Sequence, residues 1–503
     1  MFKNALVSVS DKAGLIEFLK PLYQQGLRIV STGGTAQFLK DNGMKVVDIS
    51  EQTGFPEVMG GRVKTLHPHV HMAILARGDH PEDFELLKER GLAPFDLVVC
   101  NLYPFEQAVE KKYQGAELIE KIDIGGPTVL RASAKNFSQV TVLCDPQDYP
   151  TVLAKGETTL EDRKKFAAKV FAHCSAYDSL VASELGNGWG ENFSLGGHKV
   201  MDLRYGENPQ QSATWYRLLA NQNGLHSSEI IQGKTLSYNN LLDLDAASSL
   251  VQMFSEPAAV AVKHNNPCGA AIAESIDDAV EKALKADPIS VFGGIIATNR
   301  EIGKKSAEAL HSLFLECIVA PSFTAEALEI FAKKKNLRIL KWAGLSQKQT
   351  SFEMKTVAGG FLLQNKDQVK TETSEWQFKG EKPSSAVLRD LQFGEKVCAT
   401  LKSNAIAVVK NGQSVGLGMG QVNRIDAVHQ ALERMKTHFG SLQEAVLISD
   451  AFFPFPDSVE IAAQAGIRWI LQPGGSVKDE EVFRRAQELK INMVMTGQRH
   501  FKH

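Results

Sequence analysis

Short runs of aliphatic and β-branched residues alternate with helical patterns over residues 5–145. The runs include ALVSVS, LRIVS, MKVVDIS, FDLVVCN and QVTVLC. After the first run, Leu15, Phe18, Leu19 and Leu22 follow the i, i+3, i+4, i+7 spacing of one helix face. This alternation predicts a parallel sheet covered by helices. Ligands bind beyond the carboxyl ends of strands in such sheets, so we expect SVSDK, STGGT and NLYPF to line a site.

The pattern changes beyond residue 150. Residues 161–185, EDRKKFAAKVFAHCSAYDSLVASEL, predict a long helix, and a Gly-rich stretch follows at 186–198. We therefore place a domain boundary near 199. Further on, the strand pattern AVAVK, the helix pattern SIDDAVEKALKA and the strand pattern VFGGIIAT share their layout with AIAVVK, IDAVHQALERM and AVLIS. The repeated layout predicts two related α/β lobes.

Composition and charge narrow the class of protein. The chain has 503 residues, of which 43% are hydrophobic and 23% are charged, as in folded globular proteins. At about 150 residues per domain this length predicts roughly three domains, which excludes a single small binding module. With 56 Lys and Arg against 58 Asp and Glu, no basic excess is available for a nucleic-acid backbone, so we expect no nucleic-acid partner.

The cysteines and the N-terminal segment bear on the compartment. The six cysteines include no C-x-x-C pair, which favours reduced thiols over a disulfide scaffold or a zinc cage. The apolar stretch at the N-terminus is too short for a signal sequence, and no apolar run approaches the length of a membrane span. We expect a cytoplasmic protein with no membrane partner.

A candidate phosphate site lies at residues 31–35. Ser31, Thr32, Gly33 and Gly34 connect a predicted strand to a predicted helix, where backbone N–H groups and the helix N-terminus favour an anion. A tight turn with a threonine cap explains the same residues equally well. The segment matches neither the Walker A pattern nor G-x-G-x-x-G, so neither ATP nor NAD is implied.

Residues 60–71, GGRVKTLHPHVH, concentrate two cations and three histidines in a Gly-flanked loop. Histidines two apart in an extended strand share a face, which raises the alternative of a metal site. No carboxylate or thiolate joins them at metal-ligand spacing. We expect Arg62, Lys64 and backbone amides to bind an anion instead, and we predict no metal.

Three further polar clusters lie at residues 101–105, 123–127 and 131–136. A solvated surface explains any single lysine or aspartate in them. Their positions in loops or at helix starts predict instead that Lys64, Tyr103, Asp123 and Lys135 line one edge of one sheet.

Taken together, the motifs along the chain resemble those of one protein family. SVSDK, STGGT, GGRVKTLHP, CNLYPF, IDIGGP and RASAKN are followed by LRYGENP, KHNNPCG, VFGGIIA and a terminal GQRHFKH. In this order and spacing they closely resemble the bifunctional purine biosynthesis family that joins phosphoribosylaminoimidazolecarboxamide (AICAR) formyltransferase to IMP cyclohydrolase. The resemblance implies an α/β fold with an N-terminal methylglyoxal-synthase-like parallel-sheet domain and two cytidine-deaminase-like α/β lobes.

The resemblance also implies the domains and the activities. A cyclohydrolase domain would cover 1–146, a helical connection and linker 147–199, and a formyltransferase region 200–503, with lobes near 200–365 and 366–503. The enzyme would transfer a formyl group from 10-formyltetrahydrofolate, its cosubstrate, to AICAR, and would then close the formylated product (FAICAR) to IMP with loss of water. These are the last two steps of de novo IMP synthesis. The family also implies a homodimer.

For ring closure, the resemblance assigns Lys135 as the acid/base lysine. Lys64, Tyr103 and Asp123 complete a set of proton-transfer groups around a phosphate-anchored substrate. The positions that match IMP-binding residues of the family are Ser10, Asp11, Lys12, Ser31, Thr32, Gly33, Gly34, Arg62, Val63, Lys64, Thr65, Cys100, Asn101, Asp123 and Ile124.

For formyl transfer, the key motif is KHNNPCG at the end of an apolar strand. His264 can take a proton from the weakly nucleophilic amine of AICAR near neutral pH, while Lys263 stabilises the oxyanion. Pro267 and Cys268 begin a zinc-deaminase pattern, but Ala271 stands at the second cysteine position, so we reject catalytic zinc. AICAR-binding positions implied by the family are Arg204, Tyr205, Asn240, His264, Phe292, Gly293, Glu316, Asn404, Arg424 and Arg499, and folate-binding positions are Ile425, Phe452, Asp457, Ser476 and Val477.

The chain departs from the family pattern in two places. Gln210 replaces a histidine of an N-P-H-Q motif, and residues 69–73, HVHMA, replace K-I-H-G-G. A second interpretation also stays open, because methylglyoxal-synthase-like domains serve elsewhere as regulatory nucleotide sensors. The chain would then be a monofunctional formyltransferase with an N-terminal regulatory domain. Lys64, Tyr103 and Lys135 favour catalysis, because a sensor needs no proton donor.

Overall fold

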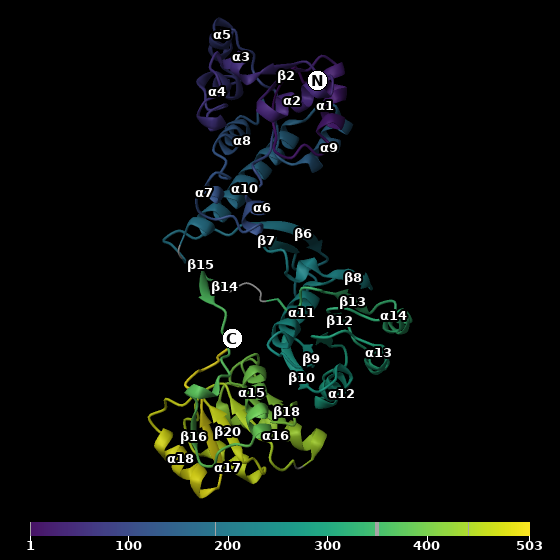
Figure 1. The fold of residues 1–503 in the computed structure, drawn as a ribbon, viewed down its shortest axis with the longest axis vertical. Helices are drawn as coiled ribbons and strands as arrows, with labels where there is room; N and C mark the ends of the chain where they lie inside the picture. The colour runs from purple at the N-terminus through teal and green to yellow at the C-terminus, as the bar shows by residue number, and fades with distance from the viewer. Residues whose placement is uncertain (1, 187, 348–351, 441) are drawn as a thin grey trace. The chain divides into compact units, whose positions relative to one another are not determined.

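The computed structural model describes residues 2–186, 188–347, 352–440 and 442–503 (Figure 1). These residues form two compact units. Residues 1–199 with 216–222 make the first unit, and residues 200–215 with 223–503 make the second. The sequence analysis placed residues 216–222 in the C-terminal region, whereas they pack with the N-terminal unit.

Glu106 is the residue that attaches segment 216–222 to the first unit. Its carboxylate accepts hydrogen bonds from the Arg217 guanidinium at 2.8 Å and from the Ala220 N–H at 3.0 Å, and it pairs with His198 at 2.9 Å. Burial raises the pKa of Glu106, but these hydrogen bonds outweigh burial and lower it to about 2. The glutamate is therefore ionised and holds the segment in place at neutral pH.

The first unit is built on a five-stranded, wholly parallel sheet in the order β3-β2-β1-β4-β5. Both faces of the sheet are covered, which explains why its strands are continuous apolar runs. In β1, Ala5 and Val7 pack toward one face and Leu6 toward the other. The strands are β1 (Asn4–Ser8), β2 (Arg28–Ser31), β3 (Val46–Asp48), β4 (Leu97–Cys100) and β5 (Thr141–Leu143).

Helices cover the two faces of this sheet. One layer packs against Ala5 and Val7 and consists of α1 (Leu15–Gln24), α2 (Gly33–Asp41) and α9 (Tyr149–Lys155). The other packs against Leu6 and consists of α4 (Pro68–Leu75), α5 (Pro81–Glu89), α8 (Gly125–Lys135) and α10 (Leu160–Leu185). Shorter elements are α3 (Ile49–Thr53), η1 (Met59–Gly61), α6 (Phe105–Glu110), α7 (Gly115–Ile119) and η2 (Pro146–Asp148), and β6 (Gly197–Leu203) pairs with β7 (Ala213–Leu218).

The second unit contains a twelve-stranded mixed sheet in the order β16-β21-β20-β19-β17-β18-β10-β9-β11-β12-β13-β8. Its first half consists of β8 (Glu229–Gln232), β9 (Ala258–Lys263), β10 (Asn266–Ile272), β11 (Ile295–Thr298), β12 (Cys317–Ala320) and β13 (Arg338–Lys341). Its second half consists of β16 (Gln377–Lys379), β17 (Ile406–Lys410), β18 (Gln413–Gly418), β19 (Val446–Ser449), β20 (Trp469–Gln472) and β21 (Asn492–Met495).

The two halves are copies of one arrangement. Each has an antiparallel edge strand, three parallel strands and a hairpin, and the hairpins meet where Ala271 pairs with Gln413. The helices repeat in the same order, as α11 (Tyr238–Val251), α12 (Ile276–Ala286), α13 (Lys304–His311) and α14 (Ala325–Phe331), then α15 (Ser385–Cys398), α16 (Arg424–Phe439), α17 (Asp457–Gln464) and α18 (Asp479–Glu488). Outside the repeat lie η3 (Leu225–Ser227), η4 (Thr373–Glu375) and the hairpin of β14 (Phe352–Val357) and β15 (Gly360–Asn365).

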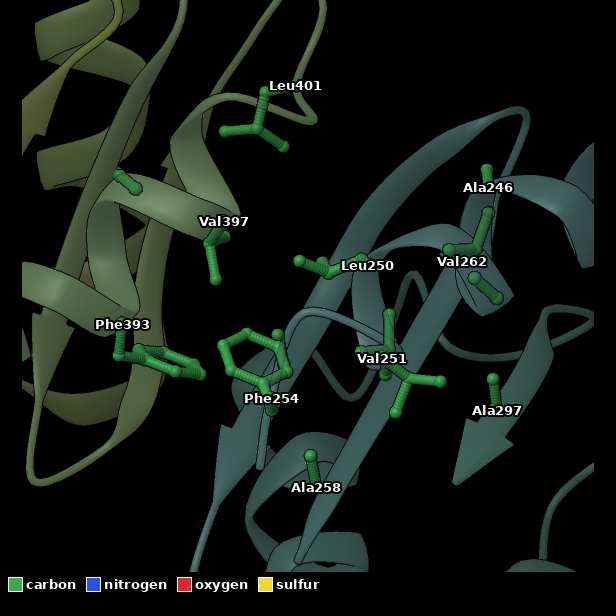
Figure 2. Packing of buried hydrophobic residues seen from close by; sticks show 14 of the residues in the cluster. Ala246, Leu250, Val251, Phe254, Ala258, Val262, Ala297, Phe393, Val397 and Leu401 are labelled. Atoms are coloured by element: carbon green, nitrogen blue, oxygen red, sulfur yellow. The ribbon is translucent and has the colours of Figure 1, made fainter. Parts of the chain in front are cut away.

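One apolar core joins the two halves. Phe254 and Phe393 stack with ring centroids 5.1 Å apart, and Leu250 of α11 and Val397 of α15 belong to the same buried cluster (Figure 2). The two related lobes therefore share one sheet and one core, and residues of both can contribute to one rigid site.

Candidate active sites

The carboxyl edge of the five-stranded sheet carries the first candidate site. The strand order reverses direction at β1, so loops after β1 and β4 flank a crevice of the kind that binds ligands in such sheets. Asn101, after β4, spans this crevice. Its Oδ1 accepts the N–H groups of Ser10 and Asp11 at 2.6 and 3.0 Å, and its Nδ2 donates to the Asp11 carbonyl at 2.8 Å. The side chain thereby fixes the SVSDK loop.

The segment after β2 forms an anion cradle. Gly33, with φ +40°, begins helix α2, and the Lys64 Nζ would lie 3.4 Å from a Cβ placed there. A positive group and a helix N-terminus thus face the same space, which favours a phosphate. Ser31 does not share that task, because its buried Oγ donates to the Val7 carbonyl at 2.6 Å. The buried Thr32 hydroxyl lies 2.9 Å from the Ser8 Oγ.

Asp123 brings the third segment to the same edge. Its carboxylate accepts the Gly126 N–H at 2.9 Å and the Tyr103 N–H at 3.3 Å. Burial raises its pKa, while these hydrogen bonds and the positive charge of Lys64 oppose that rise. A carboxyl group whose pKa is raised by burial is suited to exchanging protons near neutral pH.

The remaining predicted IMP-binding residues take varied positions around this edge. The Lys12 ammonium lies over the Phe38 ring, and Thr65 is buried beside Gly125. Arg62 is exposed and pairs with Glu120. The Cys100 thiol is buried, which raises its pKa, so only its backbone can meet a ligand. Tyr103 and Ile124 expose 44% and 61% of their surfaces, and Val63 is half-buried.

The structure does not bring Lys135 to this group. Asp123 precedes the first turn of α8, whereas Lys135 is the last residue of that helix. At about 1.5 Å of rise per residue, helix α8 separates Gly125 from Lys135 by about 15 Å. Lys135 instead lines a groove of about 630 Å³ between α8 and α10, together with Arg131 and Lys164. The prediction that Lys135 lines the same edge of the sheet as Lys64, Tyr103 and Asp123 is therefore corrected.

The histidines of residues 67–71 start a helix rather than a strand. His67 is the N-cap of α4 and accepts the His69 N–H on its Nδ1 at 3.2 Å. Burial lowers the pKa of His71. Within the ranges that the structure describes, no group of three His, Cys, Asp or Glu side chains could hold a metal ion.

The second candidate site follows from strand directions in the twelve-stranded sheet. β9 and β11 are antiparallel, with Val262 opposite Ile295, so the end of β9 and the starts of β11–β13 lie at one edge. By the same pairings, β17 begins there and β18, β19, β20 and β21 end there. This edge carries Lys263, His264, Phe292, Gly293, Glu316, Asn404, Arg424, Ile425, Phe452, Asp457, Ser476, Val477 and Arg499.

Lys263 and His264 end β9 in a tight turn. The Lys263 Nζ donates to the Phe292 carbonyl at 2.7 Å, while His264 is exposed. Asn266 connects this turn to the second lobe, because its Nδ2 donates to the His264 carbonyl at 3.0 Å and its Oδ1 accepts the Lys402 N–H at 3.3 Å. The loop that holds Asn404 is therefore tied to the histidine.

The first lobe surrounds this turn with polar groups. Glu316 pairs with Arg338 at 2.7 Å, and buried Asn240 accepts the Ser237 N–H at 3.1 Å. Arg204 lies over the Tyr205 ring in a segment that Asn239 holds against α11 through the Glu207 carbonyl at 3.2 Å.

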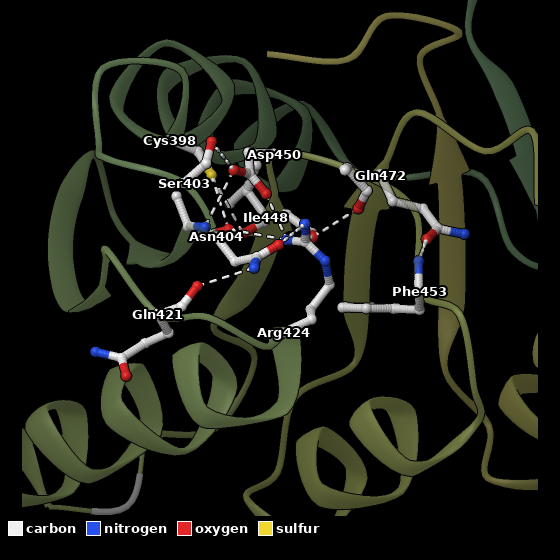
Figure 3. A network of polar contacts seen from close by, with 12 residues as sticks. Cys398, Ser403, Asn404, Gln421, Arg424, Ile448, Asp450, Phe453 and Gln472 are labelled. Carbon is white, nitrogen blue, oxygen red and sulfur yellow. Dashed lines mark hydrogen bonds and ion pairs between the residues drawn. The ribbon is translucent and has the colours of Figure 1, made fainter. Parts of the chain in front are cut away.

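In the second lobe a buried arginine organises the site. Arg424 is 7% exposed, pairs with Asp450, and donates to the Ser449 Oγ at 2.9 Å and the Asn404 Oδ1 at 2.6 Å (Figure 3). Both terminal nitrogens of the guanidinium thus donate to protein groups. Through one of these hydrogen bonds Arg424 fixes the side chain of Asn404.

The predicted folate residues lie in the loops after β18, β19 and β20 or in the first turns of the helices that follow them. Val477 is fully exposed, and Lys478 lies 4.3 Å from the Phe455 ring centroid. Asp457 begins α17, and Phe452, Ile425 and Ser476 are half-buried. Arg499, a predicted AICAR-binding residue, lies over the Phe501 ring.

Four residues of these sites were missed by the sequence reasoning. Glu57 pairs with Lys64 at 3.1 Å, Asp243 accepts the Asn265 N–H at 2.5 Å, and Arg338 and Asp450 pair with predicted site residues. Each contacts its partner across a turn or between separate elements, and no motif spacing signals the contact.

Both units place titratable side chains and lysines at one edge of a sheet, an arrangement that favours an enzyme with two sites for small anionic ligands. Family models agree: the "AICARFT/IMPCHase bienzyme" model matches residues 133–434, and the "MGS-like domain" model matches residues 14–128. The "Bifunctional purine biosynthesis protein PurH" of Bacillus cereus and that of Bacillus cytotoxicus are each 48% identical over 515 residues, covering all of both chains. A solved structure, "Crystal structure of ForH", is 36% identical, covers 37% of this chain and all of its own, and superposes with a TM-score of 0.33.

The chain belongs to the AICARFT/IMPCHase bienzyme family. It is a bifunctional enzyme of purine biosynthesis that catalyses the last two steps of IMP synthesis through its AICAR formyltransferase and IMP cyclohydrolase activities. The interpretation from motifs is thereby confirmed, and the N-terminal unit is MGS-like as predicted. The alternative of a purely regulatory N-terminal domain is set aside, because the family is a bienzyme.

Proposed function

We propose that the carboxyl edge of the β3-β2-β1-β4-β5 sheet is the cyclohydrolase site. The observation that carries this proposal is the position of the Lys64 ammonium at the Gly33 helix start, from where its positive charge also lowers the pKa of the Asp123 carboxyl. The helix start and Lys12 hold the substrate phosphate, and Asn101 keeps the adjoining loop in place. Asp123, Lys64 and Tyr103 then face the reacting end of FAICAR.

In ring closure, the carboxamide nitrogen forms a bond to the formyl carbon and gives up one proton. The formylamino N–H gives up a second proton as the C–O bond breaks, and the oxygen leaves as water. Asp123 takes the first proton, and the Lys64 ammonium polarises the formyl oxygen and supports its departure. Because both reacting groups belong to one molecule, positioning supplies a large share of the rate.

Replacing Lys64 with methionine tests this site. We expect Lys64→Met to slow conversion of FAICAR to IMP by at least about 10²-fold, the usual size of an acid–base contribution. Lys40→Met, which changes an exposed lysine at the other end of α2, is the control and is expected to keep the rate. Equal rates in both variants would contradict the proposal.

The acid/base role that the family implies for Lys135 is compatible with this structure only if the lysine comes from a second copy of the chain. A lysine side chain with a four-carbon stem does not span the length of α8. The proposed homodimer has independent support in the β14–β15 hairpin, which exposes Met354, Val357 and Leu362 by 48%, 44% and 59%, because an isolated two-stranded hairpin is only marginally stable.

Mixing variant chains tests this role in the dimer. If Lys135 acts from the partner copy, Asp123→Asn chains and Lys135→Met chains, each inactive in cyclisation, regain activity when they are unfolded, mixed and refolded together. Random pairing makes about half of the dimers mixed, and each mixed dimer contains one intact site out of two. We therefore expect up to about a quarter of the normal rate. Mixtures that stay inactive would contradict a role in trans.

We propose that formyl transfer occurs at the edge of the twelve-stranded sheet that carries Lys263 and His264. The AICAR amine attacks the formyl carbon of 10-formyltetrahydrofolate and loses a proton to His264. The bond from the formyl carbon to N10 then breaks, and N10 receives a proton as tetrahydrofolate leaves. Lys263 and Asn404 stabilise the intermediate oxyanion. Asn240, Phe292 and Glu316 would face AICAR.

The folate and the compartment complete the proposal. Ile425, Phe452, Asp457, Ser476 and Val477 would contact the folate, with Lys478 available for its carboxylates. The six cysteines are free and buried, which supports work in a reducing compartment, the cytoplasm. Among the described residues, none of the helices combines the length and the apolar character that crossing a bilayer requires.

A further inference from the structure

The internal repeat duplicates the scaffold that presents His264. Asp243 in α11 and Asp390 in α15 occupy the same position in equivalent helices. Each precedes by the same number of residues the lysine that ends the next strand, Lys263 or Lys410. The turn after Lys263 and the turn after Lys410 lie at opposite edges of the sheet. Only the first of these turns carries a histidine.

The hydrogen bonds of the two scaffolds also correspond. The Asp243 Oδ1 accepts the Asn265 N–H at 2.5 Å. Asp390 accepts the N–H groups of Asn411 and Gly412 at 2.7 and 2.6 Å. In both repeats the strand-ending lysine donates to the carbonyl of a loop before the adjacent strand of the sheet, Lys263 to Phe292 before β11 and Lys410 to Gln443 before β19. The scaffold is thus a property of the fold rather than of catalysis.

The two turns differ in their residues but not in their backbone. His264 and Asn265 have φ of +52° and +63°, and Asn411 and Gly412 have +53° and +68°. Asn-Gly is the preferred pair for such a turn. A histidine at positive φ is uncommon, and strain of this kind persists only where the surroundings impose it. The first lobe therefore holds a histidine in a conformation that it would rarely adopt unaided.

Asp243 is the side chain that accepts hydrogen bonds from this turn. It is partly buried, and burial raises its pKa, while hydrogen bonds from the N–H groups of Asn265 and His264 oppose that rise. A side chain that accepts from the backbone of this turn restrains its left-handed conformation.

We infer that Asp243 is a positioning residue for formyl transfer: its carboxylate holds the His264–Asn265 turn and so fixes where the imidazole meets the substrate amine. This inference rests on the proposed role of His264 as the base. Asp243 itself contacts the backbone and not the reacting atoms. A displacement of about 1 Å in such a group can cost about 10²-fold in rate.

The test measures kcat and KM for formyl transfer in Asp243→Ala, Asp390→Ala, His264→Ala and the double variant of Asp243→Ala with His264→Ala. We expect Asp243→Ala to lower kcat by at least about tenfold, with KM for AICAR within about threefold, as for lost alignment rather than lost binding. Asp390→Ala loosens the equivalent turn and is expected to keep kcat within about twofold. In the His264→Ala background, Asp243→Ala should cause no further loss, because alignment of an absent side chain cannot matter.

Each outcome of these measurements either supports or contradicts the positioning role of Asp243. A similar loss of kcat from Asp390→Ala, or an equal loss from Asp243→Ala with and without His264, would show a structural effect and overturn the inference. Normal formyl transfer by His264→Ala would instead overturn the proposed base and leave the clamp geometry unaffected. If Asp243→Ala does not fold, as judged by circular dichroism, Asp243→Asn replaces it. That variant keeps one acceptor oxygen and is expected to lose a smaller share of kcat, whereas unchanged kcat would contradict the inference.

Discussion

Lys263 and His264 are neighbours in the sequence, and the structure separates what they do. The Lys263 ammonium donates to a carbonyl as Lys410 does in the other repeat, so part of its role is to hold the strand end. His264 has no counterpart in the second repeat, where Asn411 stands. At the residue scale, the internal copy therefore distinguishes scaffold from chemistry, which the motif alone could not do.

The pH dependence of stability follows from His500, which is 5% exposed. Its Nδ1 lies 2.6 Å from the Asp367 carboxylate, and its Nε2 lies 3.7 Å from that of Glu395. Burial lowers the pKa of His500, but the two carboxylates outweigh burial and raise it to about 9 from 6.5. Because the folded pKa is the higher one, the stabilisation is complete below about pH 6.5 and is lost as pH rises through about 9.

We therefore expect the melting temperature to fall between pH 7 and 10 by more in the natural protein than in His500→Gln. Differential scanning calorimetry at several pH values measures both slopes. His500 neighbours Arg499, so the same pH range should loosen the C-terminal tail at the formyl-transfer edge. Parallel pH slopes in the two proteins would show that this ion pair does not carry the effect.

At the scale of elements, strand order and helix length determine which predicted site residues lie at the same edge of the sheet. The alternation of strand and helix patterns predicted the parallel sheet, and loops after its strands do carry Ser10, Gly33 and Asn101. Lys135 was misplaced because a motif shows that a residue lies on a helix but not at which end of the sheet that helix finishes. Likewise, the Gly-flanked loop expected at residues 60–71 gives way to helix α4 at Pro68, a residue type that favours the first helical turn.

Two glycines set the distance between helices and sheet in the repeat. A Cβ at Gly269 would lie 2.2 Å from the Ala283 carbonyl oxygen, and one at Gly416 would lie 2.1 Å from that of Ala431. Gly269→Ala and Gly416→Ala are each expected to lower the free energy of unfolding by about 1–3 kcal/mol through overpacking. Gly303→Ala, where a Cβ meets open space, is the control in urea denaturation. Equal stability in all three variants would contradict this packing.

At the scale of the whole molecule, the sequence indicated the two activities and the related lobes but not how the lobes are joined. Repeated strand patterns cannot show that β10 and β18 pair into one continuous sheet, because that pairing depends on residues far apart in the chain. The single pairing of Ala271 with Gln413 places loops of both lobes at one edge. The near-zero net charge of −2 is compatible with anionic substrates because cations such as Lys12, Lys64 and Lys263 are concentrated at the two sites.

The central claim is that one chain carries two separate active sites, each at an edge of its own sheet. Incubating AICAR and 10-formyltetrahydrofolate with Asp123→Asn or His264→Ala, and separating the products by chromatography, tests it most directly. Asp123→Asn is predicted to accumulate FAICAR and form little IMP. His264→Ala is predicted to form neither from AICAR but to convert added FAICAR to IMP at the normal rate. Loss of both reactions in either folded variant would contradict two separate sites.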